Sequence, residues 1–111
     1  MNNQQRKLLI TMKKLIKQGK RRFANRYDRN YKEDLFEIGI TEYEAWNNHI
    51  LRLNEAYYFV DYRPTYYKTN NTLVFKKFFN NRKVYIKLKI EKDKNSNEEC
   101  VCLSFHLDNR R

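Results

Sequence analysis

Residues 82–90 read R-K-V-Y-I-K-L-K-I, and this stretch decides the fold. Every second position is apolar, and the positions between them hold three lysines and a tyrosine. Because successive side chains of a strand point to opposite faces, the stretch predicts a strand with one apolar and one basic face. The apolar face requires a core. The basic face, which carries Tyr85 between Lys83 and Lys87, is a candidate working surface.

An asparagine pair, Asn80-Asn81, precedes this strand and predicts a two-residue hairpin turn, because asparagine tolerates positive φ. The preceding strand is then residues 72–79, and Lys76 lies directly opposite Tyr85. Directly opposed residues share a face of the sheet, and a turn one residue longer would reverse the assignment. The predicted core face holds Leu73, Phe75, Ile86 and Leu88, and the other face holds Lys76, Phe78, Lys83 and Tyr85.

Residues 98–107 predict the last strand, which follows a charged loop at residues 92–97. If Phe105 and the apolar residues that alternate with it join the core, His106 stands on the face of Tyr85 and Lys76. Residues 108–111 are expected to form a frayed polar tail. The two alternating sets are Val101, Leu103 and Phe105, expected in the core, and Cys100, Cys102, Ser104 and His106, expected on the opposite face.

The two cysteines, Cys100 and Cys102, are expected to be reduced thiols without a chemical role. They lie two positions apart on one strand, where a disulfide between them would be strained. Together with two scattered histidines they do not make a zinc site. The sequence therefore predicts neither a metal nor a cofactor.

The N-terminal part of the chain predicts two helices. Apolar residues recur at helical spacing over residues 8–17, and Gly19 ends that helix. Residues 20–25 fit either a short edge strand or a basic turn. A second short helix is predicted over residues 31–38, ending at Gly39.

The middle of the chain predicts a third helix and one more strand. Thr41 and Glu44 form a capping box at the start of the helix, and His49 lies off its apolar stripe and is expected at the surface. Residues 56–62 are rich in aromatics and predict a strand that Arg63-Pro64 ends, since proline cannot donate to a central ladder. The apolar stripe expected in the core is Tyr43, Trp46, Ile50 and Leu53.

The chain as a whole is short and strongly basic. It has 111 residues, a net charge of +11 and 15% aromatic residues. The length suits one domain, residues 1–111, which buries roughly two-thirds of its unfolded surface. The aromatic content excludes a disordered basic tail, and the charge points to a polyanion such as nucleic acid. Without a run of about 20 apolar residues or a signal peptide, we expect a cytoplasmic protein with no membrane partner.

The face shared by Lys76, Tyr85 and His106 suits nucleic-acid chemistry. Lysines neutralise phosphates and aromatics stack on bases, a combination typical of single-strand binding. Metal-free RNA cleavage needs little more: a base for the ribose 2′-OH, cations for the phosphorane and an acid for the leaving 5′ oxygen. Histidine suits the proton transfers. The plainer alternatives are a passive binding surface, or a solvated sheet face with an incidental histidine.

Six segments of the chain resemble the MqsR family, RNA-cleaving toxins of bacterial toxin–antitoxin pairs. The likeness runs from about Lys13 to His106, and its most specific parts are V-Y-I-K-L-K-I and C-L-S-F-H. The resemblance implies a RelE-like fold, cleavage of mRNA and a cognate antitoxin as partner. In order, the segments read K-K-L-I-K-Q-G-K-R-R-F, D-L-F-E-I-G-I-T, L-N-E-A-Y-Y-F, V-F-K-K, V-Y-I-K-L-K-I and V-C-L-S-F-H.

The resemblance also assigns roles to residues of this chain. It implies that Tyr85 is the catalytic tyrosine, that Lys76 stands where the best-known member has glutamine, and that His106 stands where that member has lysine. A further family lysine corresponds to Val60. That departure leaves the charge-stabilising role of the missing lysine to Lys87, Arg63 or Lys68.

The combined prediction is an α+β fold, RelE-like, with helices packed on one face of an antiparallel sheet. The predicted function is a metal-independent endoribonuclease toxin, with His106 as general base or acid and Tyr85 positioning the phosphate or sharing the proton transfer. The alternatives are a non-catalytic single-stranded nucleic-acid-binding accessory protein of a phage or mobile element, and a decayed toxin kept for complex formation. Charge stabilisation is assigned to Lys76 and Lys87, and RNA contacts are assigned to Lys83, Lys87, Lys89, Phe78, Arg63 and Lys68.

Overall fold

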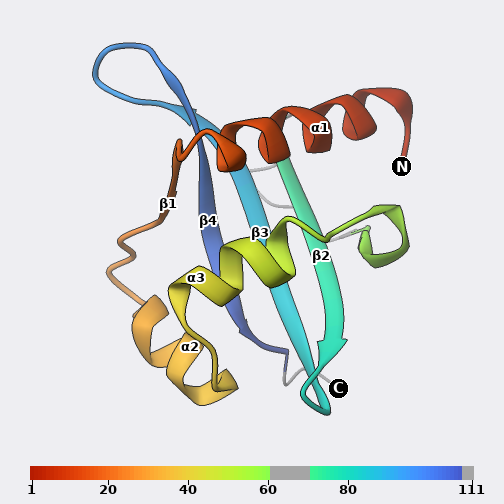
Figure 1. Cartoon of the computed structure of the whole chain (residues 1–111), viewed down its shortest axis with the longest axis vertical. Coiled ribbons are helices and arrows are strands. Elements are labelled where there is room, and N and C mark those ends of the chain that lie inside the picture. Colours follow the sequence, from red (N-terminus) through yellow and green to blue (C-terminus); the bar gives the residue numbers. More distant parts are fainter. Residues whose placement is uncertain (61–70, 109–111) are drawn as a thin grey trace.

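The fold is organised around the predicted hairpin, which forms the centre and one edge of a four-stranded sheet. The computed structural model describes residues 1–60 and 71–108. Strands β2 (Thr72–Phe79) and β3 (Arg82–Lys92) are antiparallel, as are β3 and β4 (Glu98–Leu107). A short strand, β1 (Arg21–Phe23), lies beside β4, so the order across the sheet is β1-β4-β3-β2 (Figure 1).

The hairpin turn has the predicted geometry, which fixes the predicted register. Asn80 and Asn81 both adopt positive φ, 52° and 60°. Lys76 is accordingly paired with Tyr85, and Leu73 with Leu88. The face assignment made for the β2–β3 hairpin is therefore confirmed.

The sheet is mixed, so the prediction of an antiparallel sheet is wrong at one edge. Strand β1 pairs with β4 in the parallel direction. Helix α1 (Asn3–Lys17) crosses the sheet and the chain turns at Gly19, with φ 76°, close to where β4 begins (Figure 1). The chain therefore enters β1 in the direction of β4. Of the two interpretations left open for residues 20–25, the edge strand is the one observed, at Arg21–Phe23.

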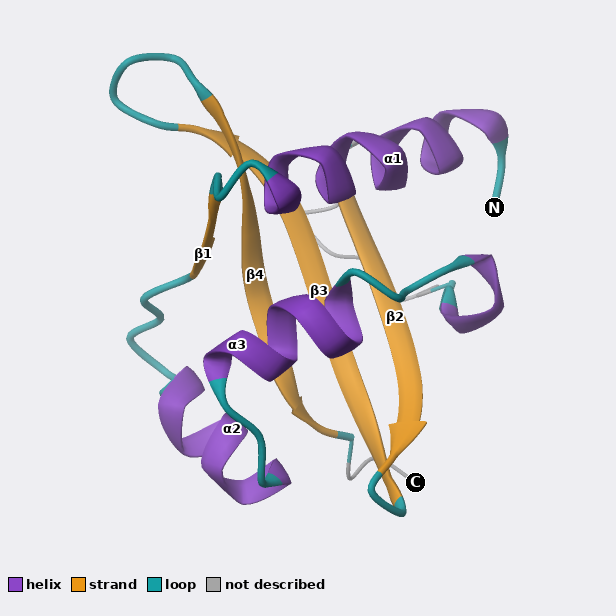
Figure 2. Ribbon diagram, viewed as in Figure 1, coloured by secondary structure: helices purple, strands orange, loops and turns teal. Residues whose placement is uncertain are grey.

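The helices cover one face of the sheet, as predicted, and the coarse α+β class is confirmed (Figure 2). Helix α2 (Tyr31–Ile38) ends at Gly39, whose φ of 89° is the left-handed conformation of a helix C-terminus. Helix α3 (Glu42–Glu44) begins with the predicted capping box of Thr41 and Glu44. It continues directly into a π-helical segment, η1 (Ala45–Ile50).

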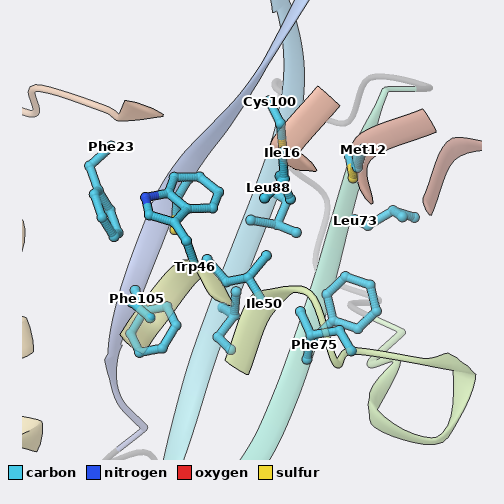
Figure 3. Close-up of a cluster of buried hydrophobic side chains, with 14 of the residues drawn as sticks. Met12, Ile16, Phe23, Trp46, Ile50, Leu73, Phe75, Leu88, Cys100 and Phe105 are labelled. Carbon is cyan, nitrogen blue, oxygen red and sulfur yellow. The ribbon is translucent and has the colours of Figure 1, made fainter. Parts of the chain in front are cut away.

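The core lies between these helices and the sheet. Trp46 and Ile50 of η1 and Met12 and Ile16 of α1 point toward the strands (Figure 3). Two predictions about the third helix are wrong because the π-helical segment changes the spacing of its side chains. Tyr43 is 69% exposed instead of buried. His49 stacks on Phe79 instead of lying at the surface, with 3.9 Å between ring centroids.

The strand predicted for residues 56–62 is also wrong over the residues that the structure describes. The Asn54 side chain accepts a hydrogen bond from the Ala56 N–H and caps a 3-10 turn, η2 (Glu55–Tyr57). Tyr58 then forms a single bridge with Phe75 of β2. The rest of that prediction, including Arg63-Pro64 as the end of the strand, lies outside the described residues.

Strand β4 contains a β-bulge that the sequence pattern does not reveal. Lys87 pairs with Ser104 whereas the next residue, Leu88, pairs with Cys102, so Leu103 is the extra residue. The bulge puts Cys100 and Cys102 on the core face, opposite Ile90 and Leu88. The core position predicted for Leu103 is therefore wrong, and that for Phe105 is confirmed. Val101 is fully buried, as predicted, but it is paired with Lys89 and lies on the other face of the sheet.

Within residues 1–60 and 71–108, no helix is both long enough and apolar enough to cross a membrane.

Candidate active site

Three of the residues singled out in the sequence form one row across the face of the sheet opposite the helices, here called the open face. Lys76 on β2 pairs with Tyr85 on β3, and Tyr85 pairs with His106 on β4. Cross-strand partners share a face and lie about 5 Å apart. The bulge lies C-terminal to Lys87 along β3, so it leaves this row intact. The structure therefore brings the three residues together, as the register predicted.

Tyr85 and His106 form the centre of the row. Their rings are stacked, with centroids 5.2 Å apart and an interplanar angle of 22°. Tyr85 is only 6% exposed, which is unusual for a polar ring on a face without helices. His106 Nδ1 lies 2.9 Å from the Leu107 carbonyl oxygen, which can only accept a hydrogen bond. This contact favours the tautomer with hydrogen on Nδ1, in which Nε2 carries the lone pair that a general base needs.

Lys76 is held by two contacts at the other end of the row. Its Nζ lies 2.9 Å from Asp108 Oδ2 and 3.9 Å from the centroid of the Phe59 ring. The Asp108 side chain is 1% exposed, so the prediction of a frayed tail is wrong at this residue. The parity of β4 contains the missed signal, because Asp108 follows His106 by two positions and so belongs to the same face.

The rows on either side add cations and one exposed aromatic ring. Phe78 is paired with Lys83 and is 69% exposed. On the other side Lys87 is paired with Ser104. Lys89 follows along β3 and lies 3.6 Å from Glu91. The four residues predicted to contact RNA on these strands therefore share the open face with the row. Arg63 and Lys68 lie outside the described residues.

Sequence reasoning missed an arginine that reaches this face from the connection after β1. Arg26 Nη1 donates hydrogen bonds to Ser104 Oγ at 3.0 Å and to the Leu103 carbonyl at 3.2 Å. Its guanidinium also pairs with Asp28. Because the bulge exposes the Leu103 carbonyl, and a bulge cannot be read from alternation, no local pattern could have identified this contact.

The positive charge does not extend over the whole open face. At the end of the sheet distant from the hairpin turn, Arg22 pairs with Glu91 and Glu99. Val60, to which the sequence resemblance assigned the position of a lysine, is 45% exposed and next to Phe59. Among the described residues, the cations closest to Tyr85 in the register are Lys76 and the lysines of β3.

Other reactive groups of the described residues do not form a second centre. Cys100 and Cys102 are buried in the core. Burial raises the pKa of the Cys100 thiol to about 12 and that of Cys102 well above its ordinary value. Such thiols stay protonated and are poor nucleophiles. Within residues 1–60 and 71–108, no three His, Cys, Asp or Glu side chains are grouped as metal ligands.

No protein-family model, curated protein or solved structure matches the chain. The candidate site is therefore described from its own residues. The site contains an imidazole stacked on a phenol, next to a lysine ammonium. The same face of the sheet carries further lysines and an exposed phenylalanine.

Proposed function

We propose that this protein is a metal-independent endoribonuclease, an mRNA-cleaving toxin of a toxin–antitoxin pair with a RelE-like fold. The observation that carries the proposal is the stacked Tyr85–His106 pair in one row with Lys76. A proton-transfer group, a phenol and a fixed cation are the parts that 2′-OH attack on a phosphodiester requires. The basic open face provides the electrostatic attraction for an RNA strand.

In the proposed reaction, His106 Nε2 takes the proton from the ribose 2′-OH. The 2′ oxygen attacks the adjacent phosphorus, and the bond from phosphorus to the 5′ oxygen breaks. The Tyr85 hydroxyl positions the phosphate or shares the proton transfer, and the Lys76 ammonium stabilises the negative charge of the phosphorane. Return of the proton to the leaving oxygen gives a 5′-hydroxyl and a 2′,3′-cyclic phosphate. Phe78 offers a surface for stacking of a neighbouring base.

The two histidines of the chain allow a matched test of this mechanism. His106→Ala should lower the rate of RNA cleavage by about 10²–10⁴-fold, the usual contribution of one general acid or base. His49→Gln should leave the rate unchanged, because His49 is packed on Phe79, on the helix-covered face of the sheet. RNA affinity should be similar in both variants. Cleavage by folded His106→Ala at the rate of the unmodified protein, or a 5′-phosphate product, would contradict the mechanism.

The proposed partners follow from the same function. We expect that expression without an antitoxin arrests growth and degrades mRNA, and that a protein encoded beside this one suppresses both effects. The measurement is culture density and transcript integrity after induction, with His106→Ala as the inactive control. Normal growth with intact transcripts, at confirmed expression of folded protein, would favour the non-catalytic alternative.

One observation favours that alternative, a single-stranded nucleic-acid-binding accessory protein. Phe78 and Lys83 pair with each other at the exposed end of the hairpin, and stacking with phosphate contact there needs no proton transfer. A protein of this kind would bind single-stranded RNA and single-stranded DNA without cleaving either. Tight binding of single strands without cleavage products, at any pH between 5 and 9, would support it.

A further inference from the structure

We propose that Asp108 is a positioning residue for the active site: its carboxylate fixes the Lys76 ammonium in the row with Tyr85 and His106. The inference rests on the proposed function, because it concerns the same site. It adds to that site a residue that was not among those predicted from the sequence or from the family resemblance.

The burial of the Lys76–Asp108 pair separates it from an ordinary surface ion pair. The two side chains are 19% and 1% exposed, and Nζ lies 2.9 Å from Oδ2. Every other ion pair among the described residues has at least one member that is 30% or more exposed. Exposed pairs are screened by water and contribute little, whereas a desolvated pair holds its partners firmly. The contact joins opposite charges at ion-pair distance.

The backbone holds the Asp108 carboxylate in place. The Asp108 N–H donates a hydrogen bond of 2.8 Å to the Lys83 carbonyl, which continues the pairing of β4 with β3 beyond Leu107. Asp108 therefore has a fixed position on the open face, two residues after His106. Residues 106–108 thus carry both the imidazole of His106 and the carboxylate that holds Lys76.

A second contact restricts the lysine from another direction. Its Nζ lies 3.9 Å from the Phe59 ring centroid, within the range of a cation–π interaction. Lysine has a flexible stem, and an ammonium that must stabilise a phosphorane is effective only when it is already in position. The carboxylate and the ring together restrict the ammonium before any RNA binds.

Loss of the carboxylate should therefore affect the reaction and the binding of RNA differently. Without Asp108 the ammonium is less well placed for the phosphorane, and displacement by about 1 Å can cost up to 10²-fold in rate. Loss of a negative charge near the bound phosphate should not weaken RNA binding, because it removes a repulsion between like charges. We expect kcat to fall by about 10–100-fold for Asp108→Asn, while KM stays the same or decreases.

The experiment measures kcat and KM for cleavage of a short single-stranded RNA by the full chain. Asp108→Asn is compared with Glu98→Gln, a control at the exposed start of β4 that should leave both constants unchanged. A fall in kcat without a rise in KM for Asp108→Asn supports the proposal. Unchanged kcat for Asp108→Asn overturns it.

A variant of Lys76 distinguishes a positioning role of Asp108 from a general effect on stability. If Asp108 acts through Lys76, adding Asp108→Asn to Lys76→Met should lower kcat by less than 2-fold, because the group that it positions is already absent. A merely structural role would lower kcat by the same factor in both backgrounds, and that result overturns the proposal.

Failure of the proposed function gives a different result. If the unmodified protein and Glu98→Gln do not cleave RNA, the nuclease assignment fails. The pair is then tested by urea unfolding of the unmodified protein, Asp108→Asn, Lys76→Met and the double variant. Coupled effects of Asp108→Asn and Lys76→Met on unfolding would retain Asp108 as the group that fixes Lys76. Additive effects would overturn that role as well.

Discussion

The two faces of the sheet come from the same strands and obey different constraints. On β3, Ile86 and Leu88 are fully buried under the helices, while Lys83 on the other face is exposed. The helix-covered face is complete in itself, because its apolar side chains pack against α1, α2 and η1. On the open face, lysines surround a buried tyrosine, and Phe78 and Lys83 are exposed at the end of the hairpin.

The covered face contains the residues that hold the fold together, and the open face contains those of the proposed site. Close packing makes each apolar side chain on the covered face contribute to folding. Exposed side chains on the open face contribute little to folding, so their kind and order can be explained by what they contact. Tyr85, Val101 and Ser104 are exceptions, because they are buried on the open face. Substitutions of comparable residues on the two sides of the sheet test this division.

The largest expected effect separates two phenylalanines of β2. Phe75 is fully buried on the covered face, and Phe75→Ala should lower the free energy of unfolding by about 3–5 kcal/mol. Phe78→Ala should change it by less than about 0.5 kcal/mol, since Phe78 is exposed. Urea denaturation followed by circular dichroism measures both. Equal destabilisation by the two substitutions would mean that the open face is also part of the folding core.

The next effect concerns binding and compares two exposed aromatics. Phe78 on the open face and Tyr43 on α3 are both 69% exposed. Phe78→Ala should weaken binding of single-stranded RNA by roughly 1–3 kcal/mol if a base stacks there, and Tyr43→Ala should not. Fluorescence anisotropy with a labelled 2′-deoxy oligonucleotide, which cannot be cleaved, gives the affinities. A larger loss for Tyr43→Ala would place the RNA on the wrong side of the molecule for the proposed site.

A smaller effect should appear in the salt dependence of binding. If Lys83 contacts a phosphate, Lys83→Ala should lower the slope of log affinity against log salt by about 0.7. Lys17 is an exposed lysine at the end of α1, on the helix-covered side, and Lys17→Ala should leave the slope unchanged. The same anisotropy titration at several salt concentrations tests both variants. An affinity independent of salt would contradict an electrostatic open face.

The smallest effect is a pH dependence of stability that arises on the covered face. Burial and the charge of Lys77 lower the pKa of His49, Glu44 opposes this shift, and Arg52 adds to it. Its Nδ1 is buried without a hydrogen-bond partner among the described residues. The folded state therefore prefers neutral His49. The contribution of neutral His49 to the free energy of unfolding should be fully present above the pKa of about 6.5 that histidine has in the unfolded chain. It should decline as the pH falls toward the lower pKa of His49 in the folded protein.

Substitution of each histidine identifies the source of that decline. His49→Gln should weaken the loss of stability between pH 7.5 and pH 5, whereas His106→Gln should retain it. Urea midpoints at the two pH values measure the change. A decline that persists in His49→Gln and disappears in His106→Gln would show that the open face, and not the packed histidine, carries the pH dependence.

The sequence determined the features that depend on neighbouring residues. Two asparagines that tolerate positive φ fixed the turn, and the alternation of β3 then placed Lys76 opposite Tyr85. The capping box at Thr41 and the glycine at the end of α2 marked helix ends in the same way, through contacts within a few residues. These interactions are local, so they can be recognised without knowledge of the fold.

Only the tertiary structure decided the features that depend on residues distant in the sequence. The bulge at Leu103 moves the cysteines into the core, which simple alternation along β4 does not show, and it leaves His106 paired with Tyr85 as alternation predicted. The parallel direction of β1 follows from the path of α1 across the sheet. Asp108 meets Lys76 of β2 across the sheet, and the Phe59 ring contacts the same lysine. Such contacts form between segments that only folding brings together, so the physical reason for them lies in packing and not in the pattern of any one stretch.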